Sequence, residues 1–552
     1  MFCGTCGSTD SETISLHYIF SAEPCRGLDE GLCDTCQQLE VLASQISQTA
    51  ETLRRLVSRH QKLRAKRNHI HSPILNRVPS EIISSIFHHF ISGVYVSTEW
   101  NSADQDCQIE SNGDAHTPFI LGAVCRTWRN IALATPQLWR SISISLGPDN
   151  FPARVKIAQQ WLLRSGDLPL SIHIHSAIDR NEDVNRSGSE IITRCRPLIE
   201  IVNHYSKRWD HLHLNIPHFM FSYFCGDAHG APILRKLCVE PDSYNYSTEC
   251  QFRLQGERPR PQQIFIKDQR FKVVDIAWDN VTWVEAIGFH VPDCLELLRQ
   301  APQLLYCKLL NVSMSRAEFP MPSSPLTHKL HRLDFQTRDY LAGVFFAYVT
   351  LPSLTHLNCH LEEAATEYAG LPSFFSRSSC PLRELSIIDA EFDDNDLIQI
   401  LNTSPSITHL VLAPLSYYES FTPTFLFEFL ARTSILPYDD NADLANLLPK
   451  LEHLEFHAWQ DCRWNHLTDI FGPLDNIQNI RRRPLKSLKF TFVRDPMDVE
   501  ERRQAGESGY IDREVLHRIL ELKKAGIQIE VFDNTQRLDV IETSVEFYGI
   551  RK

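Results

Sequence analysis

The sequence predicts an α/β fold in which a long N-terminal helix and a small helical unit precede an irregular solenoid of parallel strands. Three observations lead to this prediction. A heptad pattern runs from Leu39 to Ile70 without Gly or Pro, apolar residues then recur at helical spacing on both sides of an acidic stretch, and a short leucine pattern repeats along most of the remaining chain. We therefore expect helices before residue 143 and repeated strands after it.

Length and composition favour a globular protein with more than one domain. The 552 residues carry a net charge of −13, so the chain as a whole repels phosphate backbones and nucleic acid is disfavoured as a partner. No stretch is apolar enough to cross a membrane, and the N-terminus lacks the pattern of a secretory signal. The 16 cysteines are therefore expected to be thiols or metal ligands in the cytoplasm or nucleus.

Residues 1–36 contain two CxxC pairs and form a candidate zinc-binding segment. Each pair can deliver two thiolates to one zinc site. Four cysteine ligands leave no open coordination position, so such a zinc would be structural. No other cofactor is expected. The alternative is four reduced cysteines in a flexible tail. The candidate ligands are Cys3, Cys6, Cys33 and Cys36.

Residues 37–71 are predicted to form an amphipathic or coiled-coil helix. Its second half is basic, and the alternatives are a coiled coil that makes a homodimer or docks a partner, and a helix that folds back on its own chain. The a and d positions are Leu39, Leu42, Ile46, Thr49, Leu53, Leu56, His60, Leu63, Arg67 and Ile70.

Residues 73–142 read as two helical segments around a loop. Pro79 is well placed to begin a helix that continues through SEIISSIFHHFI. Residues 92–117 hold five acids and neither Lys nor Arg, which predicts an exposed acidic insertion, and helical spacing resumes in PFILGAVCRTWRNIALATPQLW.

These segments resemble the F-box. The resemblance is carried by Pro79-Ser80-Glu81-Ile82-Ile83 with Ile86-Phe87, by Val124-Cys125-Arg126-Thr127-Trp128-Arg129, and by Pro136-Gln137-Leu138-Trp139. Val78 replaces the usual leucine, and the loop is longer than usual. A following WLLRSGDLPL segment, residues 161–170, and the preceding heptad helix are similar to those of fungal F-box proteins. The resemblance implies binding to a Skp-type adaptor through Pro79, Ile82, Ile86, Phe87, Leu121, Val124, Cys125, Trp128, Ile131, Leu138 and Trp139.

Residues 143–552 are predicted to form a leucine-rich-repeat array, a horseshoe of parallel strands. Units of the form L-x-x-L-x-apolar begin at Leu234, Leu330, Leu354, Leu382, Ile407, Leu451 and Leu485, with weaker copies near Leu212, Val284 and Leu304. Starts from Leu304 to Ile407 lie 24–28 residues apart, the period of this repeat. One unit cannot bury its own apolar face, so the stack forms the core.

The resemblance implies the substrate-recognition subunit of an SCF-type (cullin–RING) ubiquitin ligase, in which the repeat array binds an unidentified target protein. Such a chain would not be an enzyme, and the sequence contains no phosphate-binding loop, nucleophile elbow or HExxH motif. Two other interpretations stay open: a leucine-rich-repeat scaffold outside any ligase, and a zinc and coiled-coil protein that binds nucleic acid through the basic helix.

Overall fold

A computed structural model describes residues 34–71, 77–95, 117–146, 151–176, 188–241, 251–314, 323–337, 341–364, 370–390, 394–414, 424–434, 447–458, 464–472, 482–493 and 510–550. The chain divides into two compact units. The first comprises residues 1–144 and 152–170, and the second comprises residues 145–151 and 171–552. Within the described residues, none of the helices combines the length and apolarity needed to cross a bilayer.

The first unit is helical. Its elements are α2 (Asp34–His71), α4 (Ser80–Tyr95), α5 (Thr117–Val124), α6 (Arg126–Leu133), the 3-10 helix η4 (Pro136–Trp139) and α7 (Phe151–Arg164). The predicted long helix is therefore present, and it begins at Asp34, three residues before the expected start. The Pro79 carbonyl accepts hydrogen bonds from the amides of Ile82 and Ile83, so α4 begins where the proline predicted.

Cys125 interrupts the segment that the sequence predicts as continuous helix. Its backbone is extended, and its Sγ accepts a hydrogen bond from the Trp128 amide at 3.4 Å, so Cys125 is the N-cap of α6. The Arg129 side chain crosses the break and donates to the Gly122 carbonyl at 2.7 Å. The break lets α5 and α6 fold against each other and against α4.

The second unit is built on an open sheet whose fifteen described strands have the order β1-β2-β3-β4-β6-β8-β9-β11-β13-β14-β15-β16-β17-β18-β19. The first four residues of β1 belong to the first unit. From β3 to β18 the neighbouring strands are parallel, and β19 pairs antiparallel with β18. The strands are β1 (Ser141–Leu146), β2 (Leu170–Ser176), β3 (Trp209–Asn215), β4 (Lys236–Glu240), β6 (Gln263–Lys267), β8 (Trp283–Ile287), β9 (Tyr306–Val312), β11 (Arg332–Thr337), β13 (His356–Ala364), β14 (Glu384–Ala390), β15 (His409–Pro414), β16 (His453–Ala458), β17 (Ser487–Phe492), β18 (Gln528–Asp533) and β19 (Leu538–Asp539).

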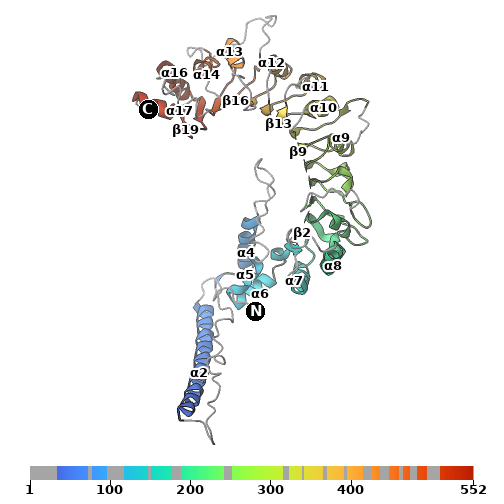
Figure 1. The fold of residues 1–552 in the computed structure, drawn as a ribbon, viewed down its shortest axis with the longest axis vertical. Helices are drawn as coiled ribbons and strands as arrows, with labels where there is room; N and C mark the ends of the chain where they lie inside the picture. The colour runs from blue at the N-terminus through green and yellow to red at the C-terminus, as the bar shows by residue number, and fades with distance from the viewer. Residues whose placement is uncertain are drawn as a thin grey trace. The chain divides into compact units, whose positions relative to one another are not determined.

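Helices of this unit lie along one side of the strands (Figure 1). They are α8 (Gly188–His204), α9 (Val291–Gln300), α10 (Leu341–Ala347), α11 (Gly370–Ser378), α12 (Asp394–Asn402), α13 (Thr424–Arg432), α14 (Trp464–Asp469), α16 (Arg513–Lys524) and α17 (Val540–Tyr548). The 3-10 helices are η5 (Ser206–Arg208), η6 (His218–Tyr223), η7 (Phe271–Val273) and η8 (Trp278–Asn280), and short pairs join β5 (Phe252–Arg253) to β7 (Val274–Asp275) and β10 (Leu326–Thr327) to β12 (Val349–Thr350).

The core lies between the strands and these helices. Phe335 of β11 stacks on Phe345 of α10 with ring centroids 4.8 Å apart, and Phe346 contacts Phe374 of α11 at the same distance. Alternate strand residues face this core, as in β16, where Leu454 and Phe456 are buried. Each strand–helix pair therefore buries its apolar side chains against its neighbours in the sheet.

The coarse prediction is confirmed: the chain is a mixed α/β protein with a long N-terminal helix and a large, mostly parallel sheet. Each of the ten predicted leucine units lies in a strand or leads directly into one. The sequence analysis missed β6, because Pro261 stands where the repeated units begin with an apolar residue. The acidic insertion at 92–117 lies largely outside the described residues, as do Cys3, Cys6 and Cys33.

Candidate protein-interaction surfaces

An apolar face is exposed on the helical unit of residues 77–139. Ile86 is 54% exposed and Val124 is 58% exposed, although both are large aliphatic residues. Pro79 is also exposed. We call this surface the apolar face, and its members are Ile82, Ile86, Phe90, Ile120 and Val124. Exposed large apolar residues on helices that contact each other are typical of a surface that binds another protein.

Phe90 and Ile120 belong to the apolar face but were absent from the residues that the sequence analysis assigned to adaptor binding. Each lies four residues from a member that was assigned, Phe90 from Ile86 and Ile120 from Val124. That spacing puts both residues of a pair on one side of a helix. The helical period was therefore the signal that could have identified them.

The remaining candidate adaptor residues lie deeper. Phe87, Leu121, Leu138 and Trp139 are buried, and Cys125, Trp128 and Ile131 are half-buried. The Phe87 and Trp128 rings are 4.8 Å apart, which joins α4 to α6. The buried four pack within the unit, so they hold its helices together, whereas the residues of the apolar face are exposed.

Trp139 is the centre of an aromatic cluster in this unit. Its ring lies 5.4 Å from Phe119 and 5.0 Å from Trp161 of α7, and the Arg164 guanidinium sits 4.8 Å above it. Its indole Nε1 donates to the Ala132 carbonyl at 2.8 Å. The WLLRSGDLPL segment therefore supplies Trp161 and Arg164 to the core of the helical unit, in addition to following it in the sequence.

A second surface is the open face of the sheet, defined as the side of the strands that carries the half-buried and exposed residues of their alternating pattern. Parallel pairing aligns equivalent residues of successive strands, so Trp283, Tyr306, Arg332, His356 and Glu384 form one row. A parallel row runs beside it through Glu285, Lys308, Asp334 and Asn358.

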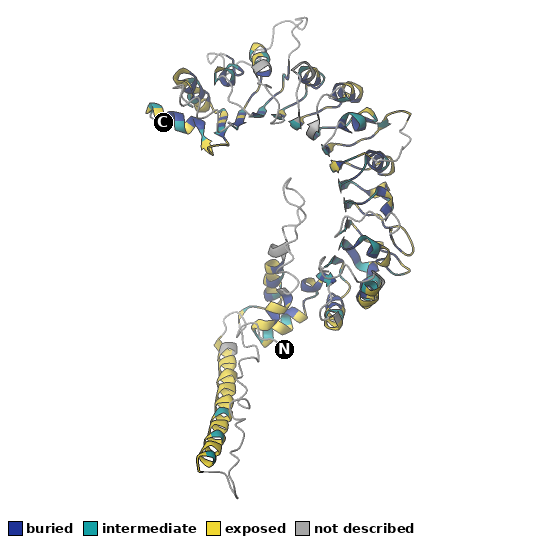
Figure 2. Ribbon diagram, in the orientation of Figure 1, coloured by how far each residue is buried: buried dark blue, intermediate teal, exposed yellow. Residues whose placement is uncertain are grey.

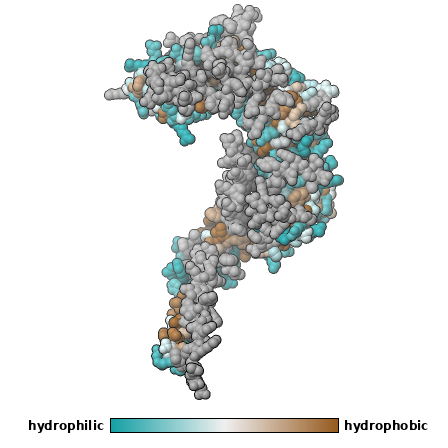
Figure 3. All heavy atoms as spheres, in the orientation of Figure 1, coloured by the Kyte–Doolittle hydropathy of each residue, from teal (hydrophilic) through white to brown (hydrophobic). Residues whose placement is uncertain are grey.

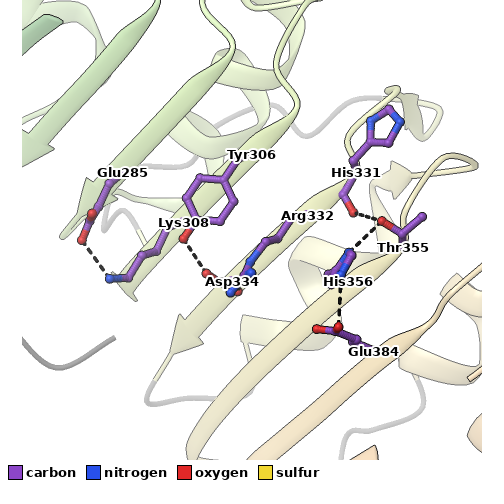
Figure 4. Close-up of polar contacts among 9 residues, drawn as sticks. All are labelled: Glu285, Tyr306, Lys308, His331, Arg332, Asp334, Thr355, His356 and Glu384. Atoms are coloured by element: carbon purple, nitrogen blue, oxygen red, sulfur yellow. Dashed lines mark hydrogen bonds and ion pairs between the residues drawn. The ribbon is translucent and has the colours of Figure 1, made fainter. Parts of the chain in front are cut away.

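Polar contacts bridge adjacent strands of the open face (Figure 4). Lys308 pairs with Glu285 at 3.0 Å, and His356 approaches Glu384 at 3.4 Å. The Tyr306 hydroxyl donates to Asp334 at 2.6 Å, and its pKa is raised by burial and by this carboxylate. The face thus presents positive, negative and aromatic groups in fixed positions.

Trp283, Tyr306 and Arg332 form a stack within the first row. The Trp283 and Tyr306 rings lie 5.5 Å apart and nearly parallel, and the Arg332 guanidinium is 5.4 Å from the Tyr306 centroid. Arg332 is exposed, whereas both rings are half-buried. Rigid aromatic and arginine side chains are the residues that most often anchor protein interfaces.

Histidines occupy the open face near the N-terminal end of the sheet. The Nδ1 atoms of His173 and His213 lie 3.3 Å apart, and His213 Nε2 is 3.7 Å from Glu240. Burial, reinforced by the neighbouring His213, lowers the pKa of His173 to about 3. Burial pushes the pKa of Glu240 upward, but the nearby His213 and a hydrogen bond of 2.8 Å from the Lys267 ammonium hold it below its usual range.

The low pKa of His173 predicts a pH-dependent contribution to stability. In the unfolded chain a histidine binds a proton near pH 6.5, whereas folded His173 does so only near pH 3. The contribution of neutral His173 to the free energy of unfolding is therefore fully present above pH 6.5. It falls by up to about 1.4 kcal/mol per pH unit as the pH drops from there toward 3. Urea unfolding at pH 7, 6 and 5 should show that the free energy of unfolding decreases less with falling pH in His173→Gln than in the wild type. An equal decrease in both proteins would contradict the low pKa of His173.

The candidate zinc ligands are not brought together by described residues. Cys36 lies in the first turn of α2 and is half-buried, and the other three precede the described chain. Among the residues that the structure describes, no group of three His, Cys, Asp or Glu side chains is arranged to hold a metal ion. Cys238, Cys307 and Cys359 are buried on strands.

Comparison with known proteins adds no family. A scan against protein-family models finds no match to this chain, and neither does a search of curated proteins. The functional assignment therefore depends on the sequence motifs and on the two surfaces described above.

Proposed function

We propose that this chain is the substrate-recognition subunit of an SCF-type ubiquitin ligase, with an F-box that binds a Skp-type adaptor and a leucine-rich-repeat array that binds the target protein. The apolar face is the observation that carries the proposal. It lies on the helices that contain the F-box-like motifs. Binding of a protein partner would bury its exposed isoleucines and valine, which is favourable.

The division of the motif residues into two sets supports this proposal. The aromatic residues Phe87 and Trp139 fix the helices from inside, while Ile82, Ile86 and Val124 point outward from α4 and α5. A preformed apolar face loses little conformational entropy on binding. The rigid core therefore favours adaptor binding by an already folded unit.

The repeated strand–helix units support a leucine-rich-repeat array as the target-binding part. The strands follow the leucine units in chain order, and their parallel register aligns the buried leucines, such as Leu333, Leu357 and Leu385. A stack of this kind offers one continuous face of variable side chains. We assign target binding to the open face, with the Trp283–Tyr306–Arg332 stack as its anchor.

In this proposal the chain acts through proximity. It would hold a lysine-bearing target close to the ubiquitin-conjugating enzyme that the cullin complex recruits, which raises the effective concentration of the two reactants. No covalent step is assigned to residues of this chain.

The proposal is tested by co-expression with a Skp-type adaptor and purification of the full chain. We expect the adaptor to co-purify with the wild type and to be reduced at least tenfold with Ile86→Asp, because the aspartate would bury an unpaired charge in the interface. Ser85→Asp is the matched control, since Ser85 is exposed on α4 beside the apolar face. Both variants should melt like the wild type.

Two outcomes would overturn parts of the proposal. Absence of adaptor binding by the wild-type chain would remove the ligase function and favour a repeat scaffold. Equal loss of the adaptor in Ile86→Asp and Ser85→Asp would remove the apolar face as the binding surface. Target proteins captured by the open face should be retained by Ile86→Asp, because the two surfaces are on different units.

A further inference from the structure

We propose that helix α2 pairs with α2 of a second copy of this chain, and that the two helices run antiparallel. This inference is independent of adaptor binding. It rests on three features of α2: an exposed apolar seam, the order of its polar layers, and an uneven charge along its length.

The apolar residues of the α2 seam are exposed. Figure 2 shows the helix exposed along its length, and Figure 3 shows hydrophobic side chains at its surface. Leu53 is 60% exposed. The other exposed residues of the heptad seam are Leu39, Leu42, Ile46, Leu56, Leu63 and Ile70. A 38-residue helix with such a seam spans about 57 Å and provides more than four heptads for a partner helix.

An antiparallel register pairs the layers of the seam in a favourable way. With Leu53 opposite Leu56 of the second copy at the centre, the a and d positions meet along the entire seam. The layers are then Leu39–Ile70, Leu42–Arg67, Ile46–Leu63, Thr49–His60 and Leu53–Leu56. The two weakly polar residues share one layer, and each Arg67 lies near a helix end, where its long side chain can extend into water.

A parallel register is less favourable. It would place Arg67 opposite Arg67 and His60 opposite His60 in the seam. It would also set Arg59 against Arg64 of the second copy across the flanking g and e positions. Like charges in contact across such an interface oppose pairing.

The charge along α2 also selects the antiparallel direction. Residues 34–51 carry three acids and neither Lys nor Arg, whereas residues 52–71 carry seven Lys and Arg and no acid. An antiparallel pair sets the acidic half of each helix beside the basic half of the other. Charge complementarity therefore favours a second copy over a strongly acidic partner helix, which would leave residues 34–51 facing like charge.

The mass of the full chain tests the pairing. Light scattering at micromolar concentration should give twice the 63.5 kDa chain mass for the wild type and a monomer for Leu53→Asp. Ser58→Asp is the matched control and should stay dimeric, because Ser58 lies on the outer side of the helix, away from the seam. The exposure of Leu53 means that its replacement leaves the folded core intact. A monomeric wild type would overturn the proposal.

Disulfide trapping tests the direction. Chains with Ile46→Cys and chains with Leu63→Cys, carrying different tags, should cross-link to each other when mixed and oxidised. Each alone should not cross-link, since the antiparallel register separates Ile46 from its own copy by about 25 Å. The unsubstituted chain controls for native cysteines. Cross-linking of each variant to itself would show a parallel pair and overturn the antiparallel assignment.

Discussion

The Arg483→Met variant is expected to lose about 3 kcal/mol or more of unfolding free energy. Arg483 is 3% exposed, and burial lowers its pKa to about 10, so it stays charged at neutral pH. Its guanidinium donates hydrogen bonds of 2.6 to 3.2 Å to the carbonyls of Leu430, Thr433, Leu447 and Leu448 and to the Thr433 hydroxyl. Methionine fills similar space but leaves these buried acceptors without donors.

Equilibrium urea unfolding measures this loss, and Arg483→Lys is the informative control. Lysine keeps the charge but has three donors on one atom, so it cannot reach acceptors on both sides of the planar guanidinium. We expect its loss to fall between the wild type and Arg483→Met. An unchanged unfolding midpoint in Arg483→Met would show that the α13 end and the 447–448 segment are held together by other contacts.

Trp139→Ala is expected to destabilise the helical unit by about 3–5 kcal/mol, the cost of removing a buried tryptophan. The substitution removes the ring contacts with Phe119 and Trp161 and leaves the Ala132 carbonyl without its donor. Hydrogen exchange should therefore accelerate in residues 117–139 and 158–165. Exchange should change little in β11 to β16, which belong to the other unit.

Trp139→Phe separates packing from hydrogen bonding. Phenylalanine keeps an aromatic ring in the cluster but lacks the indole donor, so about 1–2 kcal/mol of loss is expected. In the proposed function, adaptor binding should fall with Trp139→Ala, although Trp139 is only 1% exposed. Unchanged exchange in Trp139→Ala would contradict the central role given to this ring.

The strands were predictable from the sequence because their constraint is local. Leu333, Leu357 and Leu385 each belong to a buried L-x-x-L pair, and such pairs can be recognised in the sequence. QIFIK of β6 meets the same burial requirement with Ile264 and Ile266, so the pattern without leucines was overlooked. A buried strand position requires an apolar side chain of suitable shape, and isoleucine meets this requirement as leucine does.

The orientation of α4 was less predictable. Ile82 and Ile86 form one apolar stripe, and Ile83 and Phe87 form another beside it. Periodicity identifies both stripes but cannot decide which faces the interior, because that depends on where α6 packs. In the structure Phe87 contacts Trp128 of α6, so the Ile83–Phe87 stripe faces the interior and the Ile82–Ile86 stripe is exposed. The break at Cys125 also depends on packing, since the sequence around Cys125 is compatible with a continuous helix.

The aligned register of the open face has an evolutionary consequence. Along one row, successive strands carry Trp283, Tyr306, Arg332, His356 and Glu384, while the buried positions next to them stay apolar. A single substitution can therefore alter one position of the open face without disturbing the core behind it. In the proposed function, such a chain can acquire a new target in small inherited steps, each of which preserves a folded protein.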